Sequence, residues 1–189
     1  MVICAGQTGG HLGEPASRIS GDRVAKGDPR RRAAAFATHG GGHNIDPATI
    51  EDALLAHPAV EAPAAVGRPD VHAGEVPVAF VVLAERAGVP VAELAAWAAD
   101  RVPERAAAPR HVEIVDEIPH TAVGKPFKPE LRRRVAEQAA SEALAGTAVH
   151  DRLKARLVDG RVEIVVPRSA DDEAVHAALS AYAWTWRFV

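Results

Sequence analysis

The spacing of apolar and polar residues from position 44 onward predicts a series of short helices and strands. The first helix begins at Asp46, a good N-cap residue, with Pro47 in its first turn, and Glu51 and Asp52 near its start suit the helix dipole. In chain order the predicted elements are a helix at 46–57, strands at 60–66 and 75–84, a helix at 91–102, a strand at 110–115, a loop at 118–126 and a helix at 129–145.

A second group of elements follows toward the C-terminal end. It consists of strands at 149–157 and 162–166 around an Asp159-Gly160 turn and a helix at 171–183. Trp184, Trp186 and Phe188 either cover the edge of this core or pack on a surface outside the chain. We therefore predict an α+β fold, with a small antiparallel or mixed sheet flanked by helices and a C-terminal β-β-α extension. The predicted units are an irregular leader at 1–43, a domain at 44–145 and the extension at 146–189.

Composition narrows the classes of function. The 189 residues are 48% hydrophobic and 25% charged, as in a typical globular protein, and no apolar run is long enough to span a membrane. A net charge of −3 disfavours nucleic-acid binding, and no strand carries the aromatic pair of an RNA-binding sheet. Cys4 is the single cysteine, and the nine histidines form no ligand pair, so we expect no metal site. Without a signal-peptide pattern, a soluble cytoplasmic protein is expected.

One lysine has an unusual setting in a chain where lysine is rare. Lys125 follows Gly124 in a loop between a predicted strand and a predicted helix, with prolines on both sides. Glycine permits a tight turn there, and a lysine held in this way is a positioned charge that suits a phosphate or carboxylate oxygen. An ordinary surface lysine is the simpler interpretation of the Gly-Lys pair taken alone.

Further motifs precede this loop in a fixed order. They are Gly41-Gly42-His43-Asn44-Ile45-Asp46-Pro47, Ile50-Glu51-Asp52 leading to His57-Pro58, Ala65-Val66-Gly67-Arg68-Pro69-Asp70, Gly74-Glu75-Val76-Pro77, Pro109-Arg110-His111-Val112 and Val115-Asp116-Glu117-Ile118-Pro119. In this order and spacing, the chain from about Gly40 to Leu131 resembles the C-terminal domain of the AMP-forming acyl-CoA synthetases. Their adenylating superfamily includes luciferase and peptide-synthetase adenylation domains. The C-terminal extension resembles one that some bacterial members carry.

The resemblance implies a ligase that activates a carboxylic acid, such as a fatty acid, in two steps. The carboxylate attacks the α-phosphate of ATP to give an acyl-adenylate and pyrophosphate, and coenzyme A then displaces AMP, with magnesium present in the complete enzyme. Lys125, beside Gly124, matches the family's adenylation lysine, which contacts the carboxylate and α-phosphate oxygens. The Gly41-Gly42-His43 loop matches the segment that lines the pantetheine path after the domain rotates. Arg101 is either a partner for the coenzyme A phosphates or a solvated arginine.

The chain departs from the family in two respects. The family's Gly-Arg-x-x-Asp hinge has Ala33 at its arginine position and Phe36 at its aspartate position, which suggests that residues 1–39 derive from a shifted reading frame. The large N-terminal domain, which holds most ATP contacts and the acyl pocket in the family, has no counterpart. We therefore expect the isolated chain to be inactive and to bind no cofactor stably. It would complement a separate N-terminal synthetase domain or be a gene remnant, and a non-enzymatic interaction module is the alternative.

Overall fold

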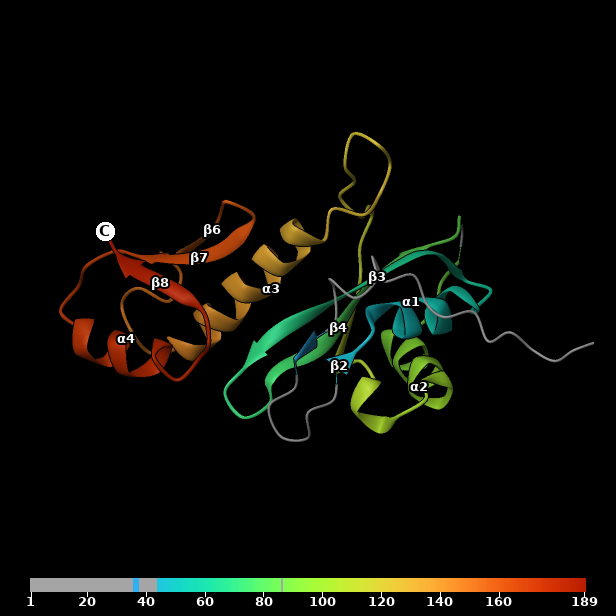
Figure 1. Cartoon of the computed structure of the whole chain (residues 1–189), viewed down its shortest axis with the longest axis horizontal. Helices are drawn as coiled ribbons and strands as arrows, with labels where there is room; N and C mark the ends of the chain where they lie inside the picture. Colours follow the sequence, from blue (N-terminus) through green and yellow to red (C-terminus); the bar gives the residue numbers. More distant parts are fainter. Residues whose placement is uncertain (1–35, 38–43, 86) are drawn as a thin grey trace, which may run out of the picture. The chain divides into compact units, whose positions relative to one another are not determined.

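The computed structural model describes residues 36–37, 44–85 and 87–189, all of which fall in one compact unit that runs from Arg32 to Val189. The elements, drawn in Figure 1, are β1 (Phe36–Ala37), β2 (Asn44–Ile45), α1 (Pro47–Leu55), β3 (Val60–Asp70), β4 (Gly74–Leu83), α2 (Val91–Arg101), a 3-10 turn (Arg105–Ala107), β5 (His111–Ile114), α3 (Lys128–Ala143), β6 (Lys154–Val158), β7 (Arg161–Val166), α4 (Asp172–Leu179) and β8 (Thr185–Phe188). None of the helices in these ranges is both long and apolar enough to cross a membrane.

The predicted start of α1 is confirmed. The Asp46 side chain accepts a hydrogen bond of 2.9 Å from the Ala48 amide, and Pro47 occupies the first turn, where its missing N–H costs nothing. The dipole role expected for Glu51 and Asp52 is wrong, because the first turn holds no acidic residue. The carboxylate of Glu51 instead accepts the Ala65 amide of β3 at 2.7 Å.

The first sheet has the order β3-β4-β5, with β3 and β4 antiparallel and β5 parallel to β4 after the α2 crossover. The prediction that β3 ends at Val66 is wrong, since its pairing with β4 continues to Asp70 opposite Gly74. The Ala65 amide points away from β4, and alternation places Pro63 and Pro69 in the same orientation. Their missing N–H groups therefore leave no ladder bond unmade.

The second sheet has the order β6-β7-β8, again an antiparallel hairpin followed by a crossover helix and a parallel strand. The β6–β7 turn uses Asp159 and Gly160 as predicted, both with positive φ. The β-β-α extension is corrected to β-β-α-β, because the expected helix at 171–183 ends at Leu179 and the chain returns as β8. Residues 149–153 are also not part of β6; Val149 and Leu153 are buried four residues apart, with Leu153 N–H donating to Val149 C=O.

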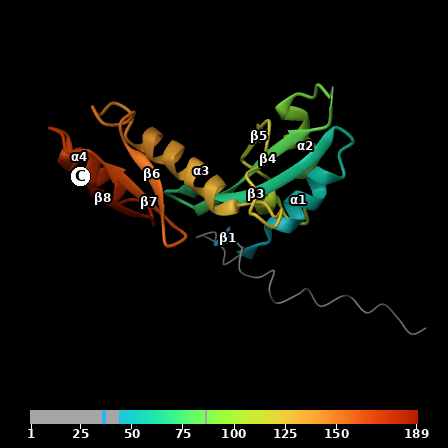
Figure 2. The same ribbon diagram turned by 90° about the horizontal axis from the view of Figure 1, so that it is seen from above.

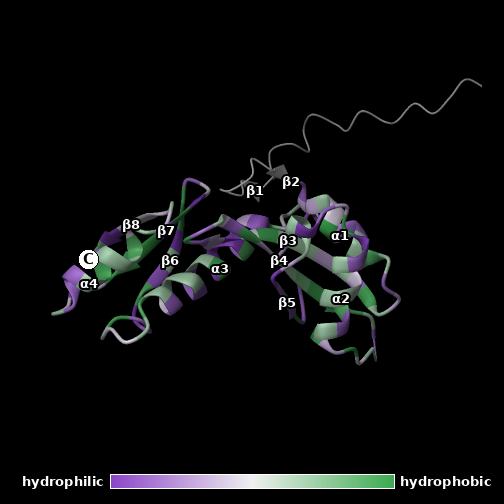
Figure 3. Cartoon of the chain, turned by 90° about the horizontal axis from the view of Figure 1, so that it is seen from below, coloured by the Kyte–Doolittle hydropathy of each residue, from purple (hydrophilic) through white to green (hydrophobic). Residues whose placement is uncertain are grey.

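Helix α3 contributes side chains to two hydrophobic cores. Leu131 and Val135 belong to the core formed with α1, α2 and the first sheet, whereas Ala136, Ala140 and Leu144 belong to the core of the extension. In Figures 1 and 2 the β3–β4 hairpin runs between α3 and α1, and Figure 3 shows that α3 also carries hydrophilic residues. The boundary at 145/146 stays a prediction, because the helix that precedes it is common to both cores.

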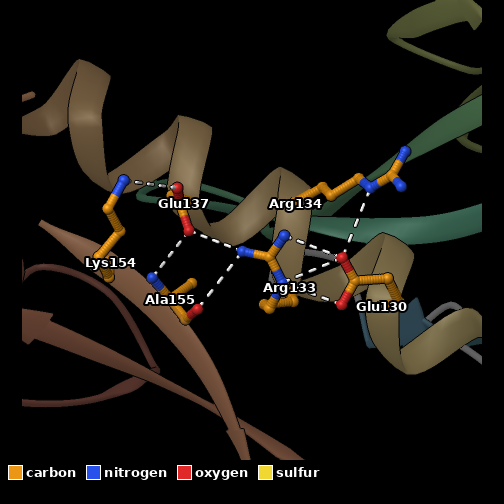
Figure 4. Close-up of polar contacts among 6 residues, drawn as sticks. All are labelled: Glu130, Arg133, Arg134, Glu137, Lys154 and Ala155. Atoms are coloured by element: carbon orange, nitrogen blue, oxygen red, sulfur yellow. Dashed lines mark hydrogen bonds and ion pairs between the residues drawn. The ribbon is translucent and has the colours of Figure 1, made fainter.

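Polar contacts reinforce the junction between α3 and β6 (Figure 4). Glu137 accepts the Ala155 amide at 2.9 Å, and Arg133 donates to the Ala155 carbonyl at 3.3 Å and to Glu137 at 2.7 Å. Arg133 also donates to both carboxylate oxygens of Glu130, which lowers the pKa of that carboxyl group. These side chains satisfy the amide and carbonyl of Ala155 at the outer edge of β6, which no further strand pairs among the described residues.

Candidate functional site

The segment from Ile118 to Lys128, here called the lysine loop, joins β5 to α3. Its start is anchored by Ile118, which is buried in the first core, and the helix that follows it is anchored there by Leu131. Between these points the loop folds back on itself: His120 and Pro126 pair as an isolated antiparallel bridge, and the Phe127 amide donates to the Pro119 carbonyl at 2.6 Å. In Figure 1 this loop projects beyond the first turn of α3.

A tight turn fixes the backbone of Lys125. The Gly124 amide donates to the Thr121 carbonyl at 2.9 Å, and Gly124 has a φ of +77°, a conformation that favours glycine. Thr121 also forms two hydrogen bonds with the backbone of Lys125: its amide donates to the Lys125 carbonyl at 2.8 Å, and its hydroxyl accepts the Lys125 amide at 3.2 Å. The turn expected at Gly124 is therefore present, and the Lys125 Cα has a defined place.

The side chain of Lys125 differs from those of the other described lysines. It is exposed, and its ammonium makes no hydrogen bond or ion pair within the described part of the chain. Lys128 pairs with Glu51 at 2.7 Å between Nζ and Oε1, and Lys154 lies 4.0 Å from Glu137. Val123, beside Lys125 at the tip of the turn, is 79% exposed. The loop thus presents an unpaired cation next to an uncovered apolar side chain.

Glu51 is a residue of this site that the sequence analysis did not connect with the lysine loop. It lies on α1, far from the loop in sequence, and its carboxylate contacts both the Ala65 amide and the Lys128 ammonium. A short motif search sees only neighbouring positions, so this contact could not have been found without the fold. The available signal was the presence of Glu51 within one of the quoted motifs.

Arg101, the other described candidate, is engaged by its own helix. Its guanidinium carbon lies 3.4 Å from the centroid of the Trp97 ring, and its Nη1 donates to the Trp97 carbonyl at 3.3 Å and to Asp100 at 3.2 Å. No hydrogen bond or ion pair joins Arg101 to the lysine loop within the residues described. The structure therefore does not bring these two candidates together, and the assignment of Arg101 to coenzyme A remains a prediction.

Several sequence-based expectations lie outside the described residues. These include the Gly41-Gly42-His43 loop, the hinge position Ala33 and the shifted-frame hypothesis for residues 1–39, of which 36–37 alone are described. Within the described ranges, no group of three or more His, Cys, Asp or Glu side chains could hold a metal ion. Magnesium, which the resemblance implies for the complete enzyme, stays a prediction, because this ion is commonly held by one or two carboxylates together with substrate phosphates.

Known proteins share this region. The family model of the AMP-binding enzyme C-terminal domain matches residues 49–125. A marinolic acid–CoA ligase from Pseudoalteromonas sp. is 46% identical over 95 residues, which are 50% of this chain and 14% of that enzyme. A long-chain-fatty-acid–CoA ligase from Bacillus subtilis is 41% identical over 98 residues, which are 52% of this chain and 17% of that enzyme.

A solved structure agrees with these relatives. An acyl-CoA synthetase from Brucella canis superposes with a TM-score of 0.51 at 36% identity, covering 57% of this chain and 20% of that one. The chain therefore spans a fifth or less of the length of the relatives named here, and what it shares with them is their C-terminal region. The resemblance to the C-terminal domain of the AMP-forming acyl-CoA synthetases is confirmed, and residues 49–125 carry it.

Proposed function

We propose that this chain supplies the C-terminal domain of an ATP-dependent, AMP-forming CoA ligase, with Lys125 as the lysine of the adenylation step. The observation that supports this most directly is the state of Lys125: its backbone is fixed by Thr121 and its ammonium has no partner within the described residues. Lys128 and Lys154, by contrast, each lie beside a carboxylate.

The chemistry of the proposed role is electrostatic. As the substrate carboxylate attacks the α-phosphorus of ATP, negative charge builds on the phosphoryl oxygens while pyrophosphate departs. The ammonium of Lys125 would contact a carboxylate oxygen and an α-phosphate oxygen, and so offset that charge in the transition state. The ATP contacts and the acyl pocket would come from an N-terminal ligase domain. We therefore propose that the 189-residue chain is inactive by itself.

The remaining candidates take supporting roles in this proposal. Gly124 permits the turn that displays Lys125, the Gly41-Gly42-His43 loop lines the path of the coenzyme A thiol in the second step, and Arg101 meets the coenzyme A phosphates. For Arg101 this role requires that the guanidinium leave the face of Trp97, where it now lies.

A chimera tests the proposal. In the Bacillus subtilis ligase, the sequence that aligns with residue 44 onward is replaced by residues 44–189 of this chain, which keeps both cores and the shared helix intact. Adenylation is measured as release of pyrophosphate from ATP and a long-chain fatty acid. We expect Lys125→Ala to lower the rate at least about 100-fold, the typical cost of removing one transition-state contact.

The control is Lys154→Ala in the same chimera, which removes an equal charge in the extension and should leave the rate unchanged. Full activity of the Lys125→Ala chimera would refute the role of this lysine in adenylation. Pyrophosphate release by the isolated chain would refute its proposed inactivity.

A further inference from the structure

The ion pair between Glu51 and Lys128 joins the lysine loop to two other elements. Lys128 is the last residue of the lysine loop and the first residue of α3, whereas Glu51 lies in the middle of α1. The Oε1 atom of Glu51 is 2.7 Å from Lys128 Nζ and accepts the Ala65 amide of β3, also at 2.7 Å. One carboxylate therefore ties the end of the loop to a helix and to the outer edge of the first sheet.

Burial strengthens this pair relative to an ordinary surface contact. The two side chains are 23% and 22% exposed, compared with 66% for Lys154 in its longer contact with Glu137. An ion pair that is largely shielded from water is screened less by salt, and here the carboxylate is already oriented by a backbone donor. The Glu51–Lys128 pair is accordingly the main polar anchor of the loop on its α3 side.

The other contacts of the lysine loop hold its α3 side less firmly than its β5 side, so the position of the α3 side depends on the Glu51–Lys128 pair. The start of the loop is held by the burial of Ile118, and its two arms are joined by the hydrogen bond from Phe127 to Pro119. Phe127 itself is 37% exposed, so apolar packing fixes the α3 side less firmly. Between Lys125 and the buried Leu131, the Lys128–Glu51 pair is the one ion pair or side-chain hydrogen bond of the described residues that leads back to the first sheet, through the Ala65 amide.

We propose that Glu51 is a positioning residue for Lys125: through Lys128 it holds the lysine loop in the orientation that displays the free ammonium. This inference rests on the proposed role of Lys125, but the order of the loop can be measured without catalysis. The competing explanation is that the pair stabilises the whole fold and has no special effect on the loop.

Three variants of the full chain separate these explanations. Glu51→Gln removes the charge but keeps an oxygen that can accept the Ala65 amide. Lys128→Met removes the ion pair and leaves the contact between Glu51 and Ala65 in place. Lys128→Arg keeps a cation in reach of Glu51 and serves as the conservative rescue. Lys154→Met is the control for loss of one lysine charge elsewhere.

The measurement is amide hydrogen exchange by NMR at Gly124, Lys125 and Phe127, whose N–H groups are all hydrogen-bonded within the loop. Exchange at these amides should accelerate about three- to fivefold in Glu51→Gln and Lys128→Met, the scale expected for one ion pair. It should stay at the parent rate in Lys128→Arg and Lys154→Met. Amides of β4 and α4 should be unaffected in every variant.

Two results would overturn the inference. Unchanged loop exchange in both Glu51→Gln and Lys128→Met would show that the pair does not order the loop. Equal acceleration in the loop, β4 and α4 would show that it stabilises the whole fold instead. Because exchange is measured in the isolated chain, it tests the effect of the ion pair on the loop without catalysis. Full activity of the Lys125→Ala chimera would instead refute the proposed role of Lys125, and the two outcomes can therefore be told apart.

Discussion

Replacing Leu144 by alanine tests whether the two cores that share α3 unfold as one unit. Leu144 is the C-cap residue of α3, is fully buried and belongs to the core of the extension. The change removes three carbon atoms, worth about 0.8 kcal/mol each in lost burial, and leaves a cavity, so the expected cost is about 2–5 kcal/mol. For a chain of 189 residues this predicts a fall of about 2–4 °C in Tm per kcal/mol, or about 6–12 °C for a mid-range loss of about 3 kcal/mol.

The assay compares two probes in a Trp97→Phe background. The remaining indoles, Trp184 and Trp186, pack against the core of the extension and report it by fluorescence, while far-ultraviolet circular dichroism reports all helices. If the shared helix couples the cores, the Tm measured by fluorescence and the Tm measured by circular dichroism should fall by the same amount in Leu144→Ala. The reasoning fails if fluorescence melts early while most of the circular dichroism signal keeps the parent Tm. Leu55→Ala, at a side chain 54% exposed, is the control and should cost less than about 0.5 kcal/mol.

Two further predictions concern the loop turn and a half-buried carboxylate. Gly124→Ala should cost about 1–2 kcal/mol in urea denaturation because φ is +77°, whereas Gly88→Ala, with equally open space and no left-handed backbone, should cost little; equal effects would contradict this. Burial raises the pKa of Glu75 above its ordinary value of 4.5, against a smaller opposing attraction from Arg132. The folded state thus binds the carboxyl proton of Glu75 more tightly than the unfolded state does. The contribution of this proton to the free energy of unfolding is therefore present below the unfolded pKa and is lost as pH rises through the folded pKa. Glu75→Gln should therefore gain stability relative to the parent between about pH 4 and pH 7 in urea titrations, and a relative loss over that range would contradict the assignment.

Local signals predicted the elements whose structure is decided locally. Asp46 and Pro47 gave the start of α1, and the apolar run at 75–84 gave β4 to within one residue at each end. Long-range pairing decided the rest. β3 continues through Pro69 because β4 pairs with it, and β8 forms because β7 offers a parallel edge to Thr185–Phe188.

The candidate site likewise contains residues that local sequence predicted and residues that depend on the fold. Lys125 and Gly124 could be named from the sequence because the motif that contains them is contiguous, and the turn depends on residues within the loop itself. The difference between Lys125 and Lys128 could not be seen, because it depends on Glu51 approaching from another helix. The error at 149–153 is a misjudged period, since Val149 and Leu153 follow helical rather than strand spacing.

The position of α3 in both cores also affects the order in which the two cores can fold during synthesis. During synthesis the N-terminal part emerges first, but the first core includes Leu131 and Val135 and is incomplete until α3 has left the ribosome. The same helix then offers Ala136, Ala140 and Leu144 as a ready surface for the strands that follow. α3 is thus the last element needed to complete the first core and the first element on which the core of the extension can pack.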